Sequence, residues 1–280
     1  MKAVVLLQLL RRNPLLGFAL LLVLLQVLLA LLAPFLGFQD PYHQVMVQRM
    51  KPPGELNLLG TDHLGRDVLS RIVHGYRSSL LTCSMAVLLA LLTGGTLGLL
   101  AGFYRGWFDR VVMRIMDIFF AFPIMLLAIG VIAILGPGLW GAALAIGIVY
   151  TPIFARLLRA PALIVSESEY VMSARAIGAS DARILFHHIL PNLSSLILVQ
   201  TSLLLSAAVL VEASLSFLGL GAQPPVPSLG LALSEGRNFL MLSPWPAVFS
   251  GLAILFLSFG FNLLGDALRD TLDPRLRGNE

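Results

Sequence analysis

The sequence predicts an all-α, polytopic membrane protein with six transmembrane helices. Hydrophobic residues make up 58% of its 280 residues and charged residues only 12%, and the mean hydropathy is +0.88. Soluble domains carry about 25% charged residues. The charges are also segregated, because long apolar runs alternate with short polar segments. A chain that crosses a bilayer several times needs this pattern.

Six apolar runs approach the roughly 20 residues that a helical span needs. The first run is longer than the core of a signal peptide, which holds about 7–15 apolar residues, so we expect an uncleaved anchor. Pro123 interrupts the third run and the fourth run is short, so the ends of these two are the least defined. The runs are residues 15–38, 80–103, 118–135, 139–155, 190–211 and 247–264.

The distribution of positive charge predicts the orientation of the spans. A cytoplasmic N-terminus makes the first, third and fifth connections external. Of the 19 Lys and Arg residues, 13 then lie on the cytoplasmic side and six lie outside, which is the sign of the positive-inside bias. We therefore expect both termini, and the polar segment between the fourth and fifth runs, to face the cytoplasm.

That polar segment predicts two short helices joined by a turn. Ser166 and Glu169 have the spacing of a capping box that could begin the first helix. Gly178 can adopt the left-handed conformation that ends it. Ser180 can cap the second helix, with Asp181 in its first turn near the positive end of the helix dipole. A capped helical hairpin held at a membrane surface has a shape suited to binding a partner.

The sequence shows no catalytic or nucleotide-binding motif of its own. Its only lysines, Lys2 and Lys51, do not follow the glycine pattern of a P-loop, so we expect no ATP site of that kind. G-x-S-x-G and H-E-x-x-H are absent, and the G-x-G-x-x-G match at 136–141 joins two apolar runs without a βαβ unit. We assign no catalytic, cofactor-binding or metal-binding residue.

A metal site in the first external loop is one alternative. His43 and His63 lie there with Asp40, Asp62 and Asp67. Imidazole and carboxylate groups are suitable ligands, but their spacing matches no standard metal motif. The composition of the loop therefore leaves this site open without favouring it.

A proton-coupled carrier is the other alternative, because such a carrier needs ionisable groups deep in its spans. The nearest candidates are Asp117 and Glu212. We expect both near the ends of their spans, with Arg114 pairing with Asp117 from position i−3. These positions disfavour proton coupling.

Two further patterns predict how helices pack. Residues 65–77 have one apolar face and are expected to form an amphipathic helix on the membrane surface. The glycines Gly94, Gly95, Gly98 and Gly102 in the second run predict close contact with a neighbouring helix, since small residues let two backbones approach.

The polar segment resembles the EAA loop of bacterial ABC importer permeases. Residues 170–192 read YVMSARAIGASDARILFHHILPN, and the family pattern is a helix of small residues, a glycine and then an I-L-P triplet. The glycine here is Gly178. Met172, Ser173 and Ala174 stand where the general form has Glu-Ala-Ala. The peptide-transporter branch of the family commonly lacks that glutamate.

Three other segments extend the resemblance over nearly the whole chain. Residues 59–71, LGTDHLGRDVLSR, are similar to the LGTDxxGRDxxSR signature of permeases of the DppC/OppC type. Residues 214–225 resemble their external loop after the fifth span, and residues 261–274 resemble their C-terminal ending. Leu229 precedes Gly230 where many members have tryptophan.

The resemblance implies a MetI-like, type I importer permease fold that forms half of a translocation pathway in a bacterial or archaeal cell membrane. Its substrates would be di- or oligopeptides, with glutathione or nickel as alternatives and a proton-coupled carrier as the alternative of another class. The expected parts are an N-terminal anchor with an extracytoplasmic segment (1–78), a permease core (79–270) that contains the cytoplasmic loop 166–191, and a cytoplasmic tail (271–280).

The resemblance also implies partners. These are a homologous second permease of the DppB/OppB type, two ABC ATPase subunits that bind ATP with Mg²⁺, an extracytoplasmic substrate-binding protein and the lipid bilayer; nucleic acid is not expected. The chain itself would hold no cofactor and catalyse no reaction. The ATPase contacts would lie in the 169–191 loop, at Glu169, Ala174, Arg175, Ala176, Ile177, Gly178, Ala179, Ser180 and Asp181.

Overall fold

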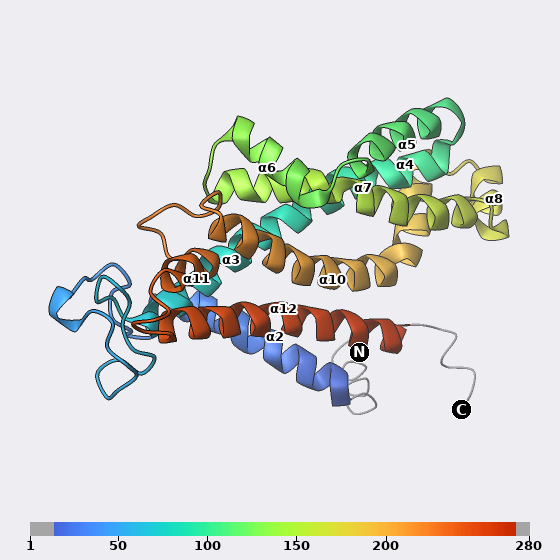
Figure 1. The fold of residues 1–280 in the computed structure, drawn as a ribbon. Helices are drawn as coiled ribbons and strands as arrows, with labels where there is room; N and C mark the ends of the chain where they lie inside the picture. The colour runs from blue at the N-terminus through green and yellow to red at the C-terminus, as the bar shows by residue number, and fades with distance from the viewer. Residues whose placement is uncertain (1–13, 273–280) are drawn as a thin grey trace.

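A computed structural model describes residues 14–272 of the chain (Figure 1). In this part the regular structure is helical, apart from one isolated β-bridge between Thr61 and Asp67. Arg11, Arg12 and most of the predicted tail lie outside the described residues.

Five helical stretches within residues 14–272 are long and apolar enough to cross a membrane, and a bent pair of helices makes a sixth. The prediction of six membrane spans is confirmed when that pair is counted as one span. The five are α2 (Pro14–Leu32), α3 to α4 (Val68–Tyr104), α7 (Leu139–Ser166), α9 to α10 (Asp181–Phe217) and α12 (Trp245–Leu272).

The prediction of one continuous third span over 118–135 is wrong. The chain instead forms α5 (Gly106–Phe120) and α6 (Ile124–Leu135), which meet at an angle of 95°. Pro123 stands between them, and proline has no N–H for a helical hydrogen bond and its ring clashes with the preceding turn. The apolar run therefore continues through a break in the helix.

Several helices extend well past the apolar runs that predict them. The second span joins α3 (Val68–Ala90) to α4 (Thr96–Tyr104) through a π-helical segment, Leu91–Gly95. The fifth joins α9 (Asp181–Arg183) to α10 (Leu190–Phe217) through another, Ile184–Ile189. The bilayer sets the length of the apolar run but not the length of the helix.

The predicted surface helix over 65–77 is also wrong. These residues form the first turns of α3, which begins at Val68. Val68, Ile72 and Val73 are buried within the protein. The apolar face therefore packs against other parts of the chain, whereas a surface helix would turn it toward lipid.

The glycine-rich face of the second span packs directly against α7, as predicted. A Cβ atom would lie 2.0 Å from the backbone oxygen of Thr151 at Gly94 and 2.2 Å from that of Ala155 at Gly98. Such distances mean that the two helix backbones are in contact, as small residues allow.

The bundle has two ends with different structure (Figure 1). At one end, called here the hairpin end, α8 (Glu169–Ala176) lies on the same side as the start of α2 and the end of α12. At the other, called the loop end, lie the long connection 33–67 and α11 (Leu229–Arg237). The polar segment and the LGTD signature therefore lie at opposite ends of the bundle.

Candidate functional site

The predicted turn of the hairpin is present and is closed by two backbone hydrogen bonds. Gly178 has φ +85°. Its N–H donates to the oxygen of Arg175 at 3.0 Å, and the N–H of Ala179 donates to the oxygen of Ala174 at 3.0 Å. These two bonds form a Schellman motif, which ends α8 and satisfies its last carbonyls. The second arm begins as predicted, because the Ser180 hydroxyl accepts the N–H of Arg183 at 3.4 Å.

The predicted capping box of Ser166 and Glu169 is wrong. Ser166 is the last residue of α7, and its hydroxyl donates back to the oxygen of Leu163 at 2.8 Å. The N-cap position of α8 belongs to Ser168, whose side chain makes no capping bond. Each of the two serines precedes a glutamate, so the sequence pattern does not tell which of them is the N-cap. The Ser166 hydroxyl is also occupied by another contact, because Arg105 donates to Ser166 Oγ at 2.9 Å.

Contacts inside the chain hold the two arms of the hairpin together. Val171 of the first arm and Ile184 of the second are fully buried in one apolar cluster. Asn192 Nδ2 donates to the Tyr170 hydroxyl at 2.9 Å and so joins the start of α10 to α8. Because an apolar core and a hydrogen bond both link the arms, the hairpin is a single packed unit.

The hairpin also exposes apolar side chains, one at its turn and one in each arm. Ile177 is 87% exposed, Phe186 is 63% exposed and Met172 is 55% exposed. Sequence reasoning missed Met172 and Phe186, although their apolar character in a polar segment was a usable signal. Three exposed apolar side chains in one short polar segment make the hairpin a candidate interaction surface.

The nine predicted contact residues divide by exposure. Ala174 is buried inside the hairpin and Ala179 is half-buried, so Ala174 contributes to packing within the chain. The exposed ones are Glu169, Arg175, Ala176, Ile177, Gly178, Ser180 and Asp181.

Two of these exposed residues contact the end of α4. The Arg175 guanidinium lies 5.4 Å from the centre of the Phe103 ring, a cation–π distance. The Asp181 carboxylate lies beside the Tyr104 hydroxyl. The tip of the hairpin is thus linked to the second span as well as to the fifth.

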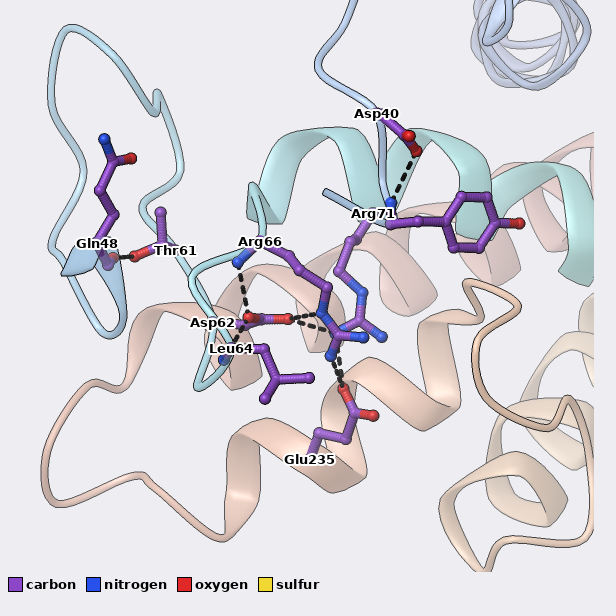
Figure 2. A network of polar contacts seen from close by, with 9 residues as sticks. Asp40, Gln48, Thr61, Asp62, Leu64, Arg66, Arg71 and Glu235 are labelled. Atoms are coloured by element: carbon purple, nitrogen blue, oxygen red, sulfur yellow. Dashed lines mark hydrogen bonds and ion pairs between the residues drawn. The ribbon is translucent and has the colours of Figure 1, made fainter. Parts of the chain in front are cut away.

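At the loop end, the LGTD signature builds a buried cluster of two carboxylates and two guanidiniums (Figure 2). Asp62 Oδ2 accepts from Arg66 Nε at 2.7 Å and from Arg71 Nη1 at 2.6 Å. Glu235 Oε2, from α11, accepts from Arg66 Nη2 at 3.0 Å and from Arg71 Nη1 at 2.6 Å. We call these four residues the loop-end charge cluster. It joins the loop, α3 and α11 with matched charges.

The remaining polar residues of the signature shape the loop. The Asp67 carboxylate accepts the N–H of Ser70 at 2.7 Å and so caps α3, and it also accepts from Asn57 at 2.9 Å. Gly65 has φ +73°, and a Cβ there would lie 1.9 Å from the oxygen of Val45. Only glycine fits that close approach in a left-handed conformation.

The geometry of this region favours ion pairing over a metal. Among the described residues, Asp62, His63 and Glu235 bring one ligand atom each within 4.8 Å of one another. Both carboxylates already bind the two guanidiniums, whereas a metal would require those oxygens. Of the other candidates, Asp67 caps α3 and Asp40 accepts the N–H of Tyr42.

The loop-end charge cluster changes the acidity of Asp62. Burial alone would raise the pKa of the Asp62 carboxyl, but the charge of Arg71, a hydrogen bond from the Arg66 backbone and the Arg66 guanidinium lower it below the ordinary value of 3.8. A carboxylate whose pKa falls on folding stabilises the folded state above its unfolded pKa.

We therefore expect the contribution of Asp62 to stability to be complete above pH 3.8 and to be lost as the pH falls through the lowered pKa. Thermal unfolding of the wild-type and Asp62→Asn proteins at a series of pH values measures this contribution to stability. The wild-type advantage is expected at neutral pH and should shrink below about pH 4. A difference that stays constant down to acid pH would contradict this role of the carboxylate.

Two ion pairs connect α5 to α7, a feature that sequence reasoning did not find. Arg159 of α7 pairs with Asp109 of α5, and Arg156 of α7 pairs with Asp117. The predicted pairing of Asp117 with Arg114 is therefore wrong. The carboxylate pairs with an arginine of α7, which packs against α5, and not with the arginine at i−3.

Glu212 lies five residues before the end of α10 and is fully buried. Its carboxylate accepts from Ser216 at 2.7 Å and from Ser79 of α3 at 2.9 Å. Ser228, the N-cap of α11, donates to it at 3.5 Å. Hydrogen bonds from three helices therefore satisfy this carboxylate, as burial of a polar group requires.

The chain is similar to known proteins over most of its length. Residues 94–278 match the family described as "Binding-protein-dependent transport system inner membrane component". The chain is 44% identical over 268 residues to the dipeptide transport system permease protein DppC of Alkalihalophilus pseudofirmus, covering 96% of this chain and 88% of that protein. It is 46% identical over 256 residues to the glutathione transport system permease protein GsiD of Pectobacterium atrosepticum, covering 91% and 85%.

The fold is similar to solved structures of an importer. A chain of the MetNI methionine ABC transporter, in an inward facing conformation, aligns with a TM-score of 0.60 and 19% identity. The alignment covers 73% of this chain and 98% of that one. The expected MetI-like, type I permease fold is thereby confirmed. The chain belongs to the binding-protein-dependent transport system inner membrane components, as a multi-pass bacterial ABC importer permease of the DppC/OppC type.

Proposed function

We propose that this permease carries peptides and that separate ATPase subunits drive it through the hairpin. The observation that carries the proposal is the exposure of Met172, Ile177 and Phe186 around the capped Gly178 turn. Lipid does not account for this surface, because the hairpin is polar overall and projects beyond the apolar runs. A partner with an apolar groove would bury all three side chains.

The proposed machine has two permeases and separate sources of energy and substrate. A second permease of the DppB/OppB type would complete the pathway, and two ABC ATPases would bind ATP with Mg²⁺, while this chain binds no cofactor. An extracytoplasmic binding protein would deliver the substrate at the loop end. The hairpin and both termini would then be cytoplasmic, which agrees with the excess of positive charge on that side.

Peptide is the proposed substrate, since relatives named as dipeptide permeases are 42–44% identical to this chain. Glutathione is the second candidate, because the relative named for it is 46% identical. Glutathione is itself a tripeptide, so both candidates share amide bonds and charged ends. Uptake of labelled dipeptide and glutathione by the reconstituted complex would decide between them.

Replacing Gly178 with valine tests the coupling role. A β-branched residue at φ +85° strains the turn, and the left-handed conformation costs about 1–2 kcal/mol per residue. Because 1.4 kcal/mol corresponds to about tenfold in an equilibrium, we expect uptake and substrate-stimulated ATP hydrolysis to fall by roughly tenfold. Both are measured in proteoliposomes that contain the assembled complex.

Gly106→Val is the matched control. Gly106 has φ +60°, and like Gly178 it has no atom within 4 Å of a built Cβ, but it lies outside the hairpin. Gly106→Val should therefore bring similar strain and leave coupling intact. Unchanged uptake and hydrolysis in Gly178→Val would show that the docking role is wrong. Uptake that needs no ATPase and stops with a proton uncoupler would instead support the carrier alternative.

A further inference from the structure

One face of α5 combines exposed arginines with exposed apolar side chains. Its residues recur at spacings of three and four positions, so they form a single stripe along the helix. Figure 1 shows α5 at the edge of the bundle, beside α4 and α7. We call this exposed stripe the α5 outer face, and it consists of Trp107, Arg110, Val111, Arg114 and Ile115.

The acidic residues of α5 are already engaged by α7. Asp109 pairs with Arg159, and Asp117 pairs with Arg156. Asp109 and Asp117 are the only acidic residues of α5. Neither of them pairs with an arginine of the α5 outer face, so the two positive charges of that face are not neutralised by their own helix.

The two arginines of the outer face have donors left for a ligand. Arg110 Nε donates to the oxygen of Gly106 at 3.3 Å, and Arg114 makes no ion pair among residues 14–272. Each guanidinium has five N–H donors. Arg110 and Arg114 are four positions apart, which places them one above the other on the helix surface. Together they form a site that attracts an anion.

The ion pairs with α7 show where this face lies along the bundle. Asp109 and Asp117 flank the two arginines in the sequence of α5. Their partners on α7, Arg159 and Arg156, follow the apolar run of the fourth span, which ends at residue 155. The α5 outer face therefore lies where an apolar span ends, and the polar headgroups of a bilayer begin at that level.

The shape of the face calls for a ligand with an apolar part. A hollow of about 350 Å³ lies on it and is lined by the same five residues. Val111 is 36% exposed and Ile115 is 45% exposed, so apolar walls stand beside the two guanidiniums. Trp107 is 71% exposed, and tryptophan is enriched where a membrane meets water. An inorganic anion would contact only the arginines, whereas a phospholipid would contact the whole face.

We propose that the α5 outer face binds an anionic phospholipid. Its phosphate lies against Arg110 and Arg114, because guanidiniums match the geometry of phosphate oxygens. One acyl chain runs along Val111 and Ile115, and Trp107 lies at the level of the headgroup. Basic residues beside membrane spans attract anionic lipids in this way. The site does not depend on what the permease transports, so it stands or fails separately from the proposed function.

Photo-crosslinking in the assembled complex tests what covers this face. Ile118 continues the stripe one turn further and is 57% exposed, so Ile118→p-benzoylphenylalanine leaves the five residues intact. The complex is placed in nanodiscs with equal amounts of phosphatidylglycerol and phosphatidylcholine, and mass spectrometry identifies the adducts. An arginine near an anionic surface favours anionic lipid by about fivefold. We therefore expect lipid adducts in which phosphatidylglycerol exceeds phosphatidylcholine by roughly twentyfold. Adducts mainly with another subunit, or equal amounts of both lipids, would overturn the proposal.

Arginine variants test whether the two guanidiniums select the lipid. Adding Arg110→Gln or Arg114→Gln to the Ile118 variant should each lower the ratio of the two lipids by about fivefold. Arg269→Gln is the matched control, since Arg269 is exposed in the last turn of α12, outside this face, and it should leave the ratio unchanged. An equal fall in Arg269→Gln would mean that the overall charge attracts the lipid, and the site would be wrong.

An arm with inorganic phosphate separates a lipid from a soluble anion. At constant ionic strength, an excess of inorganic phosphate should leave both the amount of lipid adduct and the ratio of the two lipids unchanged, because phosphate lacks the acyl chain that Val111 and Ile115 contact. Loss of the phosphatidylglycerol adduct under this condition would identify a soluble anion as the ligand and overturn the assignment to lipid.

Discussion

Gly98→Val is expected to prevent α4 from packing on α7 and to destabilise the whole permease. The new Cβ would lie 2.2 Å from the backbone oxygen of Ala155 and 2.8 Å from its Cα. Backbone atoms cannot rotate away as a side chain can, so the two helices must separate. Overpacking of this kind costs about 3 kcal/mol or more, and we expect a fall of about 10 °C in the thermal unfolding midpoint in detergent.

Gly130→Val provides the control for this prediction. Gly130 lies in α6, and no atom lies within 4 Å of a Cβ built there. Both substitutions place valine at a helical glycine of an apolar segment, so their effects on helix propensity and hydropathy are alike. If the two proteins unfold at the same temperature, contact between the α4 and α7 backbones does not determine stability.

Arg71→Met is expected to destabilise the loop end by about 3 kcal/mol, because it leaves buried negative charge with fewer partners. The side chains of Arg71 and Asp62 are 4% and 5% exposed, and Glu235 is 20% exposed. Arg66 still binds both carboxylates, which places the loss at the low end of the range for a broken buried pair. Thermal unfolding with protease digestion of the 33–67 loop measures this effect.

Arg77→Met is the matched substitution for that experiment. Arg77 lies on the same helix, is exposed and makes no recorded ion pair within the described residues. The Arg77→Met substitution removes the same charge with little loss of stability, because isolated surface charges contribute little to stability. Similar losses in both variants would mean that the loop-end charge cluster adds nothing beyond the general effect of removing an arginine.

Local signals in the sequence were sufficient to predict the structure where that structure depends on residues that are neighbours in the chain. Gly178 ends α8 and Ser180 caps the next helix because each acts through backbone groups within a few positions. Gly94 and Gly98 predicted a close helix contact for a similar reason, since a missing side chain is itself visible in the sequence.

The long-range pairings were not predictable from one sequence. Arg71 and Glu235 are 164 positions apart, and Arg156 and Asp117 are 39 apart. No local pattern connects such residues, because their contact depends on how whole helices pack. The same limit explains why Asp117 was assigned to Arg114, which is the best partner on its own helix.

The ends of the helices were also predicted wrongly, and this error has a physical cause. Hydropathy reports immersion in lipid, but α3, α7 and α10 continue as helices where packing against protein replaces the bilayer. In the opposite sense, the third apolar run remains suitable for lipid although Pro123 breaks the helix inside it.

The second arm of the hairpin and the fifth span are one helical stretch of 37 residues, about 55 Å long. Such a stretch can act as a lever. A tilt of about 5° about one end would displace the other by roughly 5 Å over that length. Its far turns, at Ala213 and Ser216, touch Gly230 of α11. A pull on the hairpin would therefore reach the loop end as the motion of one rod, without a relay of rearranging side chains between them.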